Sequence, residues 1–325
     1  MATALATLRA LPLEVLASHP TPIDRLRRLE LALGFGGPAI FMKRDDLLSF
    51  GMGGNKVRKL QAVLAPARAA GADTLITCGG VQSNHCRVTA AAGAALGLKV
   101  ILVVNGEPQA TPTGNARLDR LFGAEMHYVA SREARHPAME AIADQLRAAG
   151  RHPHVIPLGA STALGAAGFA RGVEEVLAAG LHPDLIVHST SSGGTQAGLI
   201  AGTTLFGMSC RVLGVSADDP AEALTSTIGT LLDGMSDLIG AAPSALGRTR
   251  AIEVDDTEVG GGYGVPTAAS TEAMEMVART EGIVLDPVYT AKAMAGLIAR
   301  VRAGQFSSTQ RVLFWHTGGH AGFFA

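Results

Sequence analysis

Short apolar or β-branched runs alternate with alanine-rich stretches through most of the sequence, and the apolar runs end in glycine or serine. The runs are typical of buried strands and the alanine-rich stretches of helices, so the alternation predicts the βα units of a parallel sheet and an α/β fold. Strands are expected over residues 74–78, 99–104, 184–188, 211–215 and 311–315.

Helices are expected between these strands, one ending near Leu96 and another beginning near Thr195. A further helix begins near Lys56. Pro66 lies inside it, where proline costs about 3 kcal/mol, so a kink or an early stop is expected there. In open α/β sheets ligands bind at the carboxyl ends of strands. Three of the expected strand ends carry glycine, two of them with small polar residues, at 79–80, 191–194 and 317–319.

Composition and charge narrow the classes of function. The chain has 325 residues, 47% of them hydrophobic, and can bury a large core in two lobes or in one large α/β domain. Its net charge of −1 gives no electrostatic footprint for nucleic acid or a membrane surface, and no apolar run reaches the ~20 residues of a membrane span. Small-molecule chemistry is therefore favoured.

The cysteines and the N-terminal segment predict a cytoplasmic location. Cys78, Cys86 and Cys210 are odd in number and scattered, which favours a reducing compartment over a disulfide framework. Residues 1–16 are partly apolar, but charged residues interrupt them and no cleavage pattern follows, so we interpret this segment as a mature N-terminus.

A lysine follows a glycine pair at a helix start, in Gly53-Gly54-Asn55-Lys56. The free N–H groups of such a start suit an anionic cofactor. Burial beside other cations lowers a lysine pKa and lets the neutral amine form a Schiff base, and Arg58 and Lys59 are expected to be those cations. Lys56 and Lys59 share a helix face, so one can bond an aldehyde while the other holds a phosphate. Pyridoxal phosphate (PLP) carries both groups; a solvated basic helix start is the alternative.

Two strand-to-helix junctions are candidate anion sites. Gln82-Ser83-Asn84-His85 is placed to receive a substrate carboxylate, with an ordinary helix N-cap as the alternative. Residues 191–198 (SSGGTQAG) let the backbone approach a phosphate, with a tight turn that binds nothing as the alternative. This segment lacks the lysine of a P-loop and the G-x-G-x-x-G spacing of dinucleotide folds, so a nucleotide is disfavoured.

Tyrosines and histidines supply the remaining candidates. Tyr263 and Tyr289 are expected in turns, where each either positions protons or simply packs. The histidine pairs His316/His320 and His152/His154 have no cysteine or carboxylate at ligand spacing in the sequence, so no metal is expected.

Together these segments resemble the PLP-dependent family that holds D-cysteine desulfhydrase, 1-aminocyclopropane-1-carboxylate (ACC) deaminase and L-cysteate sulfo-lyase. The matching motifs follow one order along nearly the whole chain, and they are His19-Pro20-Thr21-Pro22, Lys43 to Asp46, Gly53 to Leu60, Gln82 to His85, Thr195 to Gly198, Asp286 to Tyr289 and His316 to Gly319. Cys78 to Val81 and Ser191 to Gly194 depart from the typical pattern.

The resemblance implies a tryptophan-synthase-β-like fold (fold type II), with two open, twisted, mostly parallel sheets flanked by helices. It implies a large PLP-binding domain formed by residues 1–53 and 163–325, and a small domain formed by residues 54–162. It further implies a homodimer with PLP in the cleft between the domains.

The resemblance also implies a role for each matching residue. Lys56 forms the Schiff base, Asn84 contacts the PLP hydroxyl, and Lys59 holds the phosphate with the glycine loop. The implied cofactor-binding set is Asn55, Lys56, Lys59, Asn84, Ser192, Gly193, Gly194, Thr195 and Thr317. The implied substrate-binding set is Gln82, Ser83, Asn84 and His85, and the implied catalytic set is Lys56, Ser83, Tyr263 and Tyr289.

Two positions bear on which reaction is catalysed. In ACC deaminases, the family pattern implies a glutamate directly after the tyrosine of Asp-Pro-Val-Tyr, beside the pyridine nitrogen, where this chain has Thr290. Desulfhydrase-like members use a threonine in His-Thr-Gly-Gly, which matches Thr317. A hydroxyl holds the nitrogen protonated less well than a carboxylate, so the cofactor is a weaker electron sink. This favours β-elimination over cyclopropane opening.

The sequence therefore predicts a cytoplasmic PLP-dependent lyase that acts on a small β-substituted amino acid, with D-cysteine as the first choice of substrate. L-Cysteate sulfo-lyase is the nearest alternative, followed by ACC deaminase. A non-catalytic PLP-binding or amino-acid-sensing protein is an alternative from another class, and the retained Lys56, Ser83, Tyr263 and Tyr289 disfavour it because a pure binder needs no acid–base groups.

Overall fold

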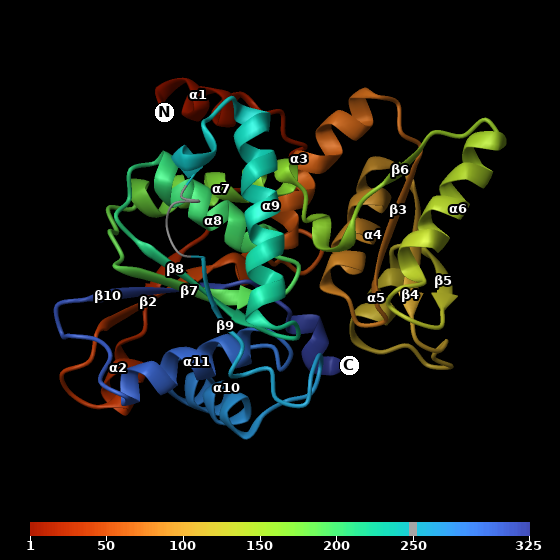
Figure 1. The fold of residues 1–325 in the computed structure, drawn as a ribbon. Helices are drawn as coiled ribbons and strands as arrows, with labels where there is room; N and C mark the ends of the chain where they lie inside the picture. The colour runs from red at the N-terminus through yellow and green to blue at the C-terminus, as the bar shows by residue number, and fades with distance from the viewer. Residues whose placement is uncertain (247–251) are drawn as a thin grey trace.

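Two mostly parallel sheets organise the chain in the computed structural model, which describes residues 1–246 and 252–325 (Figure 1). The six-stranded sheet has the order β1 (Ile23–Arg25), β2 (Ala39–Arg44), β10 (Arg311–His316), β7 (Leu185–Thr190), β8 (Arg211–Ser216) and β9 (Glu253–Asp255). Among the described strands of this sheet, only β1 runs antiparallel to its neighbour. The four-stranded sheet is fully parallel, in the order β5 (Glu125–Val129), β4 (Lys99–Asn105), β3 (Thr74–Gly80) and β6 (Pro153–Val155). The predicted α/β class is confirmed.

Helices cover both faces of the six-stranded sheet (Figure 1). One face carries α1 (Ala2–Ala10), α7 (Ala163–Ala178), α8 (Gly194–Leu205) and α9 (Ala221–Ile239), and the other carries α2 (Arg27–Leu33), α10 (Ala268–Glu281) and α11 (Thr290–Arg302). Strand β10 shows why helices cover both faces of the sheet. Its Leu313 and Trp315 join one core and its Val312 and Phe314 join the other, because successive side chains of a strand point to opposite faces.

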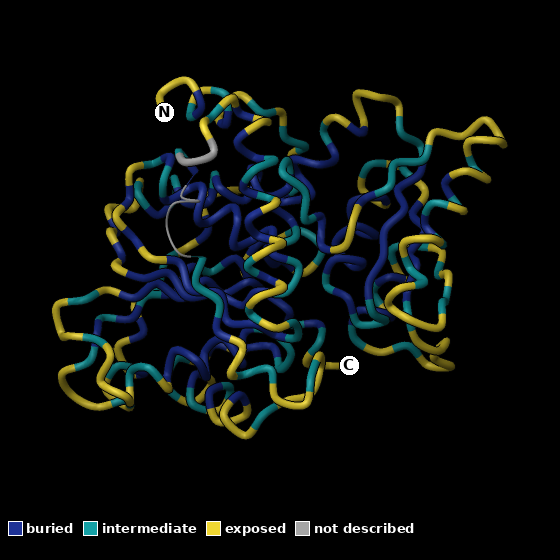
Figure 2. The backbone as a smooth tube through the Cα atoms, viewed as in Figure 1, coloured by how far each residue is buried: buried dark blue, intermediate teal, exposed yellow. Residues whose placement is uncertain are grey.

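The four-stranded sheet is covered in the same way. Helix α6 (Arg135–Ala148) packs on one face through Met139 and Ala143, while α3 (Lys56–Ala69) and α4 (Asn84–Leu96) share a core with the other. Helix α5 (Gly114–Leu121) packs beside α4. Four 3-10 turns complete the described part of the chain: η1 (Asp45–Leu47), η2 (Leu158–Ala160), η3 (Pro243–Leu246) and η4 (His320–Phe324). In Figure 2 the buried strands of both sheets run through the interior, and exposed positions gather on the outer turns.

The predicted elements match the observed ones closely. The five predicted strands are β3, β4, β7, β8 and β10, each within two residues at either end. The predicted helix that ends at Leu96 is α4, and Tyr263 and Tyr289 lie in turns as predicted. The early stop at Pro66 is wrong, because α3 continues to Ala69. The division into domains at residues 54 and 162 stays a prediction. Within the described chain, no helix combines the length and the apolar character that a membrane crossing requires.

A buried cluster of charges fixes α3 against the six-stranded sheet. Arg58 donates to both carboxylate oxygens of Asp45 at 2.7 Å and to Glu175 at 2.6 Å. Lys43 donates to the other oxygen of Glu175 at 2.6 Å, and the Trp315 indole donates to Asp45 at 2.8 Å. Burial acts to raise the pKa of Glu175, but hydrogen bonds from His19 and Arg58 and the charges of Arg58 and Lys43 outweigh it, and the pKa lies well below the usual range.

Arg58→Met is expected to lower the free energy of unfolding by about 3–5 kcal/mol at pH 7, because it leaves the buried carboxylate of Asp45 and the partly buried carboxylate of Glu175 without their shared cation. The folded pKa of Glu175 is depressed, so this contribution is present above the unfolded value of about 4.3 and is lost as the pH falls through the folded pKa. The urea midpoints of wild type and variant should therefore begin to converge below about pH 4 and approach each other further as the pH falls. Arg279→Met, which removes the exposed pair with Glu275, is the matched control and should leave the midpoint nearly unchanged. An Arg58 variant as stable as this control would contradict the prediction.

Candidate active site

One cleft forms where the carboxyl ends of strands from both sheets meet. It is lined by residues that follow β3, β4, β7, β8 and β10, together with the turn before α3 and the loops that carry the two tyrosines. The lining residues that the sequence predicted are Asn55, Lys56, Ser83, Asn84, His85, Ser192, Gly193, Thr195, Tyr263, Tyr289 and Thr317. The cleft thus brings together segments from most of the chain.

The turn before α3 places Lys56 in this cleft. Gly54 has a left-handed φ of 101°, and a Cβ at this position would lie 2.8 Å from the carbonyl oxygen of Thr317, so only glycine fits. The N–H of Asn55 donates to that same oxygen at 3.0 Å, and the Asn55 amide donates to Thr195 Oγ1 at 2.9 Å. These contacts fix the first residue of α3 between β10 and the loop after β7.

The Lys56 amine is poised to become neutral. Its burial and, second, the charge of Arg87 lower its pKa to about 8. The prediction that Arg58 supplies a neighbouring cation is wrong, because its guanidinium points to Asp45 and Glu175, which compensate its charge. Lys59 does lie near Lys56: burial and then the charge of Lys56 lower the Lys59 pKa well below its usual value.

Helix α4 begins at the cleft with Ser83 as its N-cap. The hydroxyl of Ser83 accepts a hydrogen bond from the N–H of Cys86 at 3.3 Å, and the side chain also lines the cleft. Ser83 is therefore an N-cap, and its contact with a substrate stays a prediction. The N-terminus of this 13-residue helix is directed at the cleft. The positive end of the helix dipole favours an anion there, such as a carboxylate.

Two residues of the predicted substrate set are engaged elsewhere. Gln82 does not line the cleft, since its amide nitrogen donates to Thr113 and its oxygen accepts from the N–H of Asn115 at 2.8 Å. His85 lines the cleft but is buried, with Nε2 2.7 Å from the hydroxyl of Thr77. Burial, followed by the charges of two lysines, lowers the His85 pKa well below its usual value. Gln82 thus connects α4 to α5, and His85 is neutral.

The loop before α8 is held by Ser161, a residue that the sequence analysis missed. Gly193 has a left-handed φ of 76° and starts α8. Ser161 lies behind the loop: its hydroxyl accepts from Lys59 Nζ at 3.0 Å and from the N–H of Gly194 at 3.3 Å, and lies 2.8 Å from Ser192 Oγ. Lys59 and Gly194 do not themselves line the cleft, so Lys59 acts on the loop through Ser161.

The end of β10 carries a neutral hydroxyl into the cleft. Thr317 Oγ1 lies 3.1 Å from Ser189 Oγ, and both residues line the cleft. Thr290 is fully buried outside the lining, and its hydroxyl donates to Asp286 at 2.7 Å. Asp286 also accepts from the N–H groups of Val288 and Tyr289, so its carboxylate is committed to this turn.

Tyrosines and charged residues line the rest of the cleft. The hydroxyls of Tyr263 and Tyr289 are 2.5 Å apart. Burial and, second, the charge interaction with Tyr263 raise the pKa of Tyr289 well above its usual value, so its hydroxyl keeps its proton. Arg132 lies over the Tyr263 ring, 5.2 Å from the centroid, with Nη2 3.4 Å from Asp218. Arg135 and Asp219 also line this part of the cleft.

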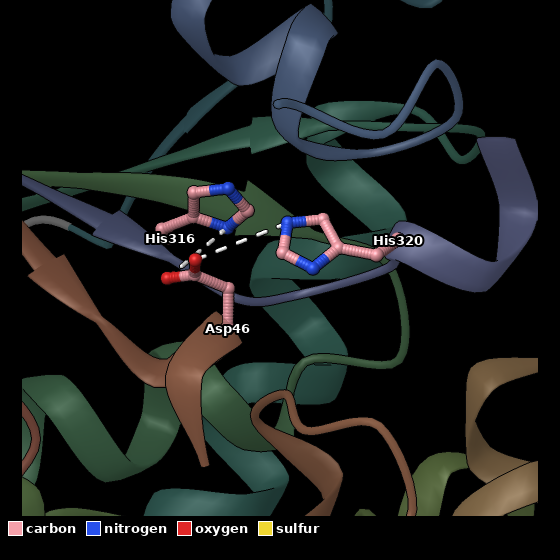
Figure 3. A group of neighbouring side chains, drawn as sticks. All are labelled: Asp46, His316 and His320. Atoms are coloured by element: carbon pink, nitrogen blue, oxygen red, sulfur yellow. Dashed lines mark ion pairs between the residues drawn. The ribbon is translucent and has the colours of Figure 1, made fainter. Parts of the chain in front are cut away.

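The fold brings a carboxylate to the histidine pair near the C-terminus, which sequence spacing did not predict. Figure 3 shows Asp46 facing His316 and His320, each with a ring nitrogen 3.9 Å from a carboxylate oxygen. The same atoms already have protein partners. Asp46 accepts from Arg44 at 2.7–3.2 Å, His316 Nδ1 accepts from Gly318 at 3.2 Å, and Nε2 of each histidine lies 3.0–3.1 Å from the carbonyl oxygen of Val284. We infer that this cluster stabilises the end of β10, which Thr317 directly follows.

Proteins with known functions resemble this chain over nearly its whole length. An ACC deaminase of Burkholderia cenocepacia is 38% identical over 96% of this chain and 95% of its own length. A D-cysteine desulfhydrase of Salmonella typhi is 37% identical over 95% of this chain and 94% of its own. The crystal structure of an ACC deaminase homologue superimposes with a TM-score of 0.91, at 35% identity, over 100% of this chain and 97% of the other.

More distant structures share the fold alone. The T.th. threonine deaminase superimposes with a TM-score of 0.69, at 20% identity, over 98% of this chain and 97% of its own, which confirms the prediction of fold type II. The family model described as pyridoxal-phosphate dependent enzyme matches residues 16–318, which include every residue of the cleft named above. The chain therefore belongs to the family of pyridoxal-phosphate dependent enzymes.

Proposed function

We propose that the protein is a PLP-dependent lyase that converts D-cysteine to pyruvate, hydrogen sulfide and ammonia. The observation that carries this proposal is the pair of neutral hydroxyls, Thr317 and Ser189, in the cleft beside the turn that bears Lys56. A neutral partner for the ring nitrogen makes a weaker electron sink, which suits the loss of a good β leaving group. Two further observations support β-elimination. The carboxylate of Asp286 already accepts hydrogen bonds from Thr290 and Tyr289, and Thr290 lies outside the cleft lining.

The residues of the cleft fit PLP. The loop of Ser192, Gly193 and Thr195 opens α8, where the N-terminal dipole favours a phosphate. The hydroxyl of Thr190, at the rim of the same loop, is buried with no hydrogen-bond partner among the described residues. We assign the phosphate to this loop, the aldehyde to Lys56 and the ring hydroxyl to Asn84. When bound, PLP supplies an electron sink for the carbon that loses its proton.

The geometry also supports a role for each group that faces the substrate. The N-terminus of α4 and Ser83 receive the substrate carboxylate. Lys56, with a pKa near 8, is matched to accept and return a proton near neutral pH. Tyr289 keeps its proton because burial raises its pKa, so it positions or donates a proton and does not act as the base. Lys56 is therefore the better candidate for removal of the α-proton.

A panel of substrates tests the proposal. Purified protein is incubated with D-cysteine, L-cysteine, β-chloro-D-alanine and L-cysteate, and formation of pyruvate is measured. We expect the highest kcat/KM with D-cysteine and turnover of β-chloro-D-alanine, which carries a good leaving group on the same α-carbon hand. Pyruvate from neither D-amino acid would overturn the proposal.

L-Cysteate is the second candidate because two arginines line the cleft. Arg132 and Arg135 offer cations to an anionic β substituent such as a sulfonate, whereas a thiol needs none. Asp218 and Asp219 line the same part of the cleft and bring an equal number of negative charges. This balance makes D-cysteine the first choice.

Arg132→Met separates the two candidates. If a sulfonate binds Arg132, kcat/KM for L-cysteate should fall about 10- to 100-fold, the loss expected for one charge-assisted hydrogen bond, with D-cysteine turnover much less affected. Under the D-cysteine proposal, wild-type protein hardly turns over L-cysteate and the variant keeps most of its D-cysteine activity. Arg147→Met, at an exposed arginine of α6, is the control for loss of a surface charge.

Ser83→Ala is expected to raise KM for D-cysteine about tenfold with a small change in kcat, because a carboxylate anchor contributes mainly to binding. A comparable fall in kcat would place Ser83 in proton transfer as well. Thr267→Ala is the matched control, since Thr267 is the N-cap of α10, outside the cleft lining, and its loss should cost stability only. If Ser83→Ala behaves as this control does, Ser83 is only a helix cap.

A further inference from the structure

Arg87 is a buried cation that joins two segments of the cleft without lining it. It lies on α4, one turn after Asn84, and is fully buried. Its Nη2 donates to the carbonyl oxygen of Gly53 at 2.9 Å, in the turn that leads to Lys56. Its Nη1 donates to Asn84 Oδ1 at 3.0 Å and to Asn115 Oδ1 at 2.9 Å. One guanidinium thus connects α4, α5 and the turn before α3.

These contacts determine which end of the Asn84 amide faces the cleft. Asn84 Oδ1 accepts from Arg87 Nη1 and from Asn115 Nδ2, both at 3.0 Å. An amide oxygen has two lone pairs, so both are used, and the N–H₂ group is left for the cleft. Asn115 is itself held by Gln82, whose side-chain and backbone oxygens accept from its two N–H groups at 2.8 Å. This explains why Gln82 points away from the cleft.

Arg87 is held at a substantial cost. The carboxylate of Asp119 is close enough to interact with it electrostatically, but neither Asp119 oxygen has a hydrogen-bond partner in the described part of the chain. Burial raises the pKa of Asp119 to about 8, against the opposing charge of Arg87, so Asp119 is mostly protonated at pH 7. Burial lowers the pKa of Arg87 to about 10 even though the charges of Asp119 and Asp286 act in the opposite direction, and strongly perturbed groups of this kind cluster at functional sites.

We propose that Arg87 is a positioning residue, which fixes the Asn84 amide so that its N–H₂ group and not its oxygen meets the ring hydroxyl of PLP. The inference rests on the assignment of Asn84 to that hydroxyl in the proposed function. A carbonyl oxygen turned toward the ionised ring oxygen would repel it, whereas an N–H group stabilises it. The contact with Gly53 holds Asn84 and the Lys56 turn at a fixed separation. The same charge helps to keep the Lys56 amine neutral.

A double-mutant cycle on the protein and its cofactor, without substrate, tests the proposal. Wild type, Arg87→Lys, Asn84→Ala and the double variant are compared by two readouts: the dissociation constant of PLP from apoprotein titration, and the pH dependence of the visible band of the bound cofactor. Lysine keeps the charge but cannot donate in a fixed fork to Gly53 and to two amide oxygens. Because no substrate is used, failure of the D-cysteine proposal leaves this result intact.

Each single variant is expected to weaken PLP binding about tenfold and to shift the pH midpoint of the band, while the double variant should be no weaker than Asn84→Ala alone. Independent, multiplying effects would show that Arg87 does not act through Asn84 and would overturn the proposal. So would an Arg87→Lys protein with wild-type affinity and titration.

Two further variants keep the test decisive. If Arg87→Lys does not fold, as judged by circular dichroism, Asn115→Ala removes the other donor to Asn84 Oδ1 and should shift both readouts in the same direction. No shift would overturn the proposed orientation. Thr89→Val is the matched control, because it removes a buried hydroxyl of the same helix that bonds to the carbonyl of His85 and does not touch Asn84.

Discussion

Replacing Lys56 with alanine is expected to abolish turnover and the covalent link to PLP together. The lysine lies in the cleft at the first residue of α3, held by the contacts of Asn55 with Thr317 and Thr195. General acid–base groups contribute about 10²–10⁴-fold, and the covalent role adds to this, so kcat should fall by at least about 10³-fold. The variant should still bind PLP through the loop before α8, but without a covalent bond.

The lowered pKa of Lys56 and its place in the cleft together explain why this lysine, among the five in the chain, is expected to react. The pKa of Lys59 is also lowered, but Lys59 does not line the cleft. At pH 7.5 a pKa of about 8 leaves roughly a quarter of the amines neutral, against about one in a thousand at the ordinary value of 10.5. Burial lowers the pKa because it disfavours the charged form, and the charge of Arg87 acts in the same direction.

Borohydride reduction provides the measurement. Wild-type protein should be yellow, lose its visible band on reduction, and carry the reduced cofactor on the peptide that contains Lys56. Lys99→Ala, at an exposed lysine of β4, should behave as wild type. A protein that takes up no PLP, or an adduct on another lysine, would rule out the assignment.

The fold was predictable from the sequence where local pattern and tertiary packing agree. The strands β3, β4, β7, β8 and β10 are buried on both faces, so they appear in the sequence as continuous apolar runs. The short strands β1, β6 and β9 are only three residues long and only partly buried, which leaves too weak a signal. The prediction of an early stop at Pro66 failed because Pro66 lies in the last turn of α3. Proline cannot donate a backbone hydrogen bond, but so near the end of the helix few residues depend on that bond.

Most of the predicted site residues lie in turns at strand ends or in the first turn of a helix. Most of them line the cleft in the structure. The residues that the sequence analysis missed act from behind or from distant segments. In the sequence, Ser161 has no signal other than its place directly before the N-cap of α7. Asp46 and His316 are in contact in the fold but lie 270 residues apart in the sequence. Arg87 had a signal, because it lies three residues after Asn84 and so shares its helix face.

Arg58 shows why adjacency in sequence is a poor guide to charge. It is two residues from Lys56, yet a helix turns by about 100° per residue, so the two side chains leave on different faces. Arg58 meets Asp45 and Glu175, while the cation that affects Lys56 comes from α4. The electrostatics of the site thus depend on the packing of α4 against α3, which no local pattern encodes.

ACC is expected to be a poor substrate, with kcat/KM at least about a hundredfold below that of the best β-elimination substrate. ACC has no β leaving group, so ring opening depends on the electron sink of the cofactor alone. Under the proposed function the neutral hydroxyls of Thr317 and Ser189 would meet the ring nitrogen, and a hydroxyl holds that nitrogen protonated less well than a carboxylate does. The expected factor corresponds to about 2.7 kcal/mol of lost transition-state stabilisation.

Formation of 2-oxobutyrate from ACC, measured beside pyruvate from D-cysteine, tests this expectation. The variant Thr290→Glu is measured beside the wild type, because it introduces the glutamate that the family pattern gives to ACC deaminases. In this structure Thr290 is fully buried, lies outside the cleft lining and donates to Asp286. A glutamate there would place a second carboxylate beside Asp286, so we expect a lower urea midpoint and no gain in ACC turnover. Efficient ACC turnover by the unmodified protein would show that the placement of Ser83 and the tyrosines, and not the group at the ring nitrogen, determines the reaction.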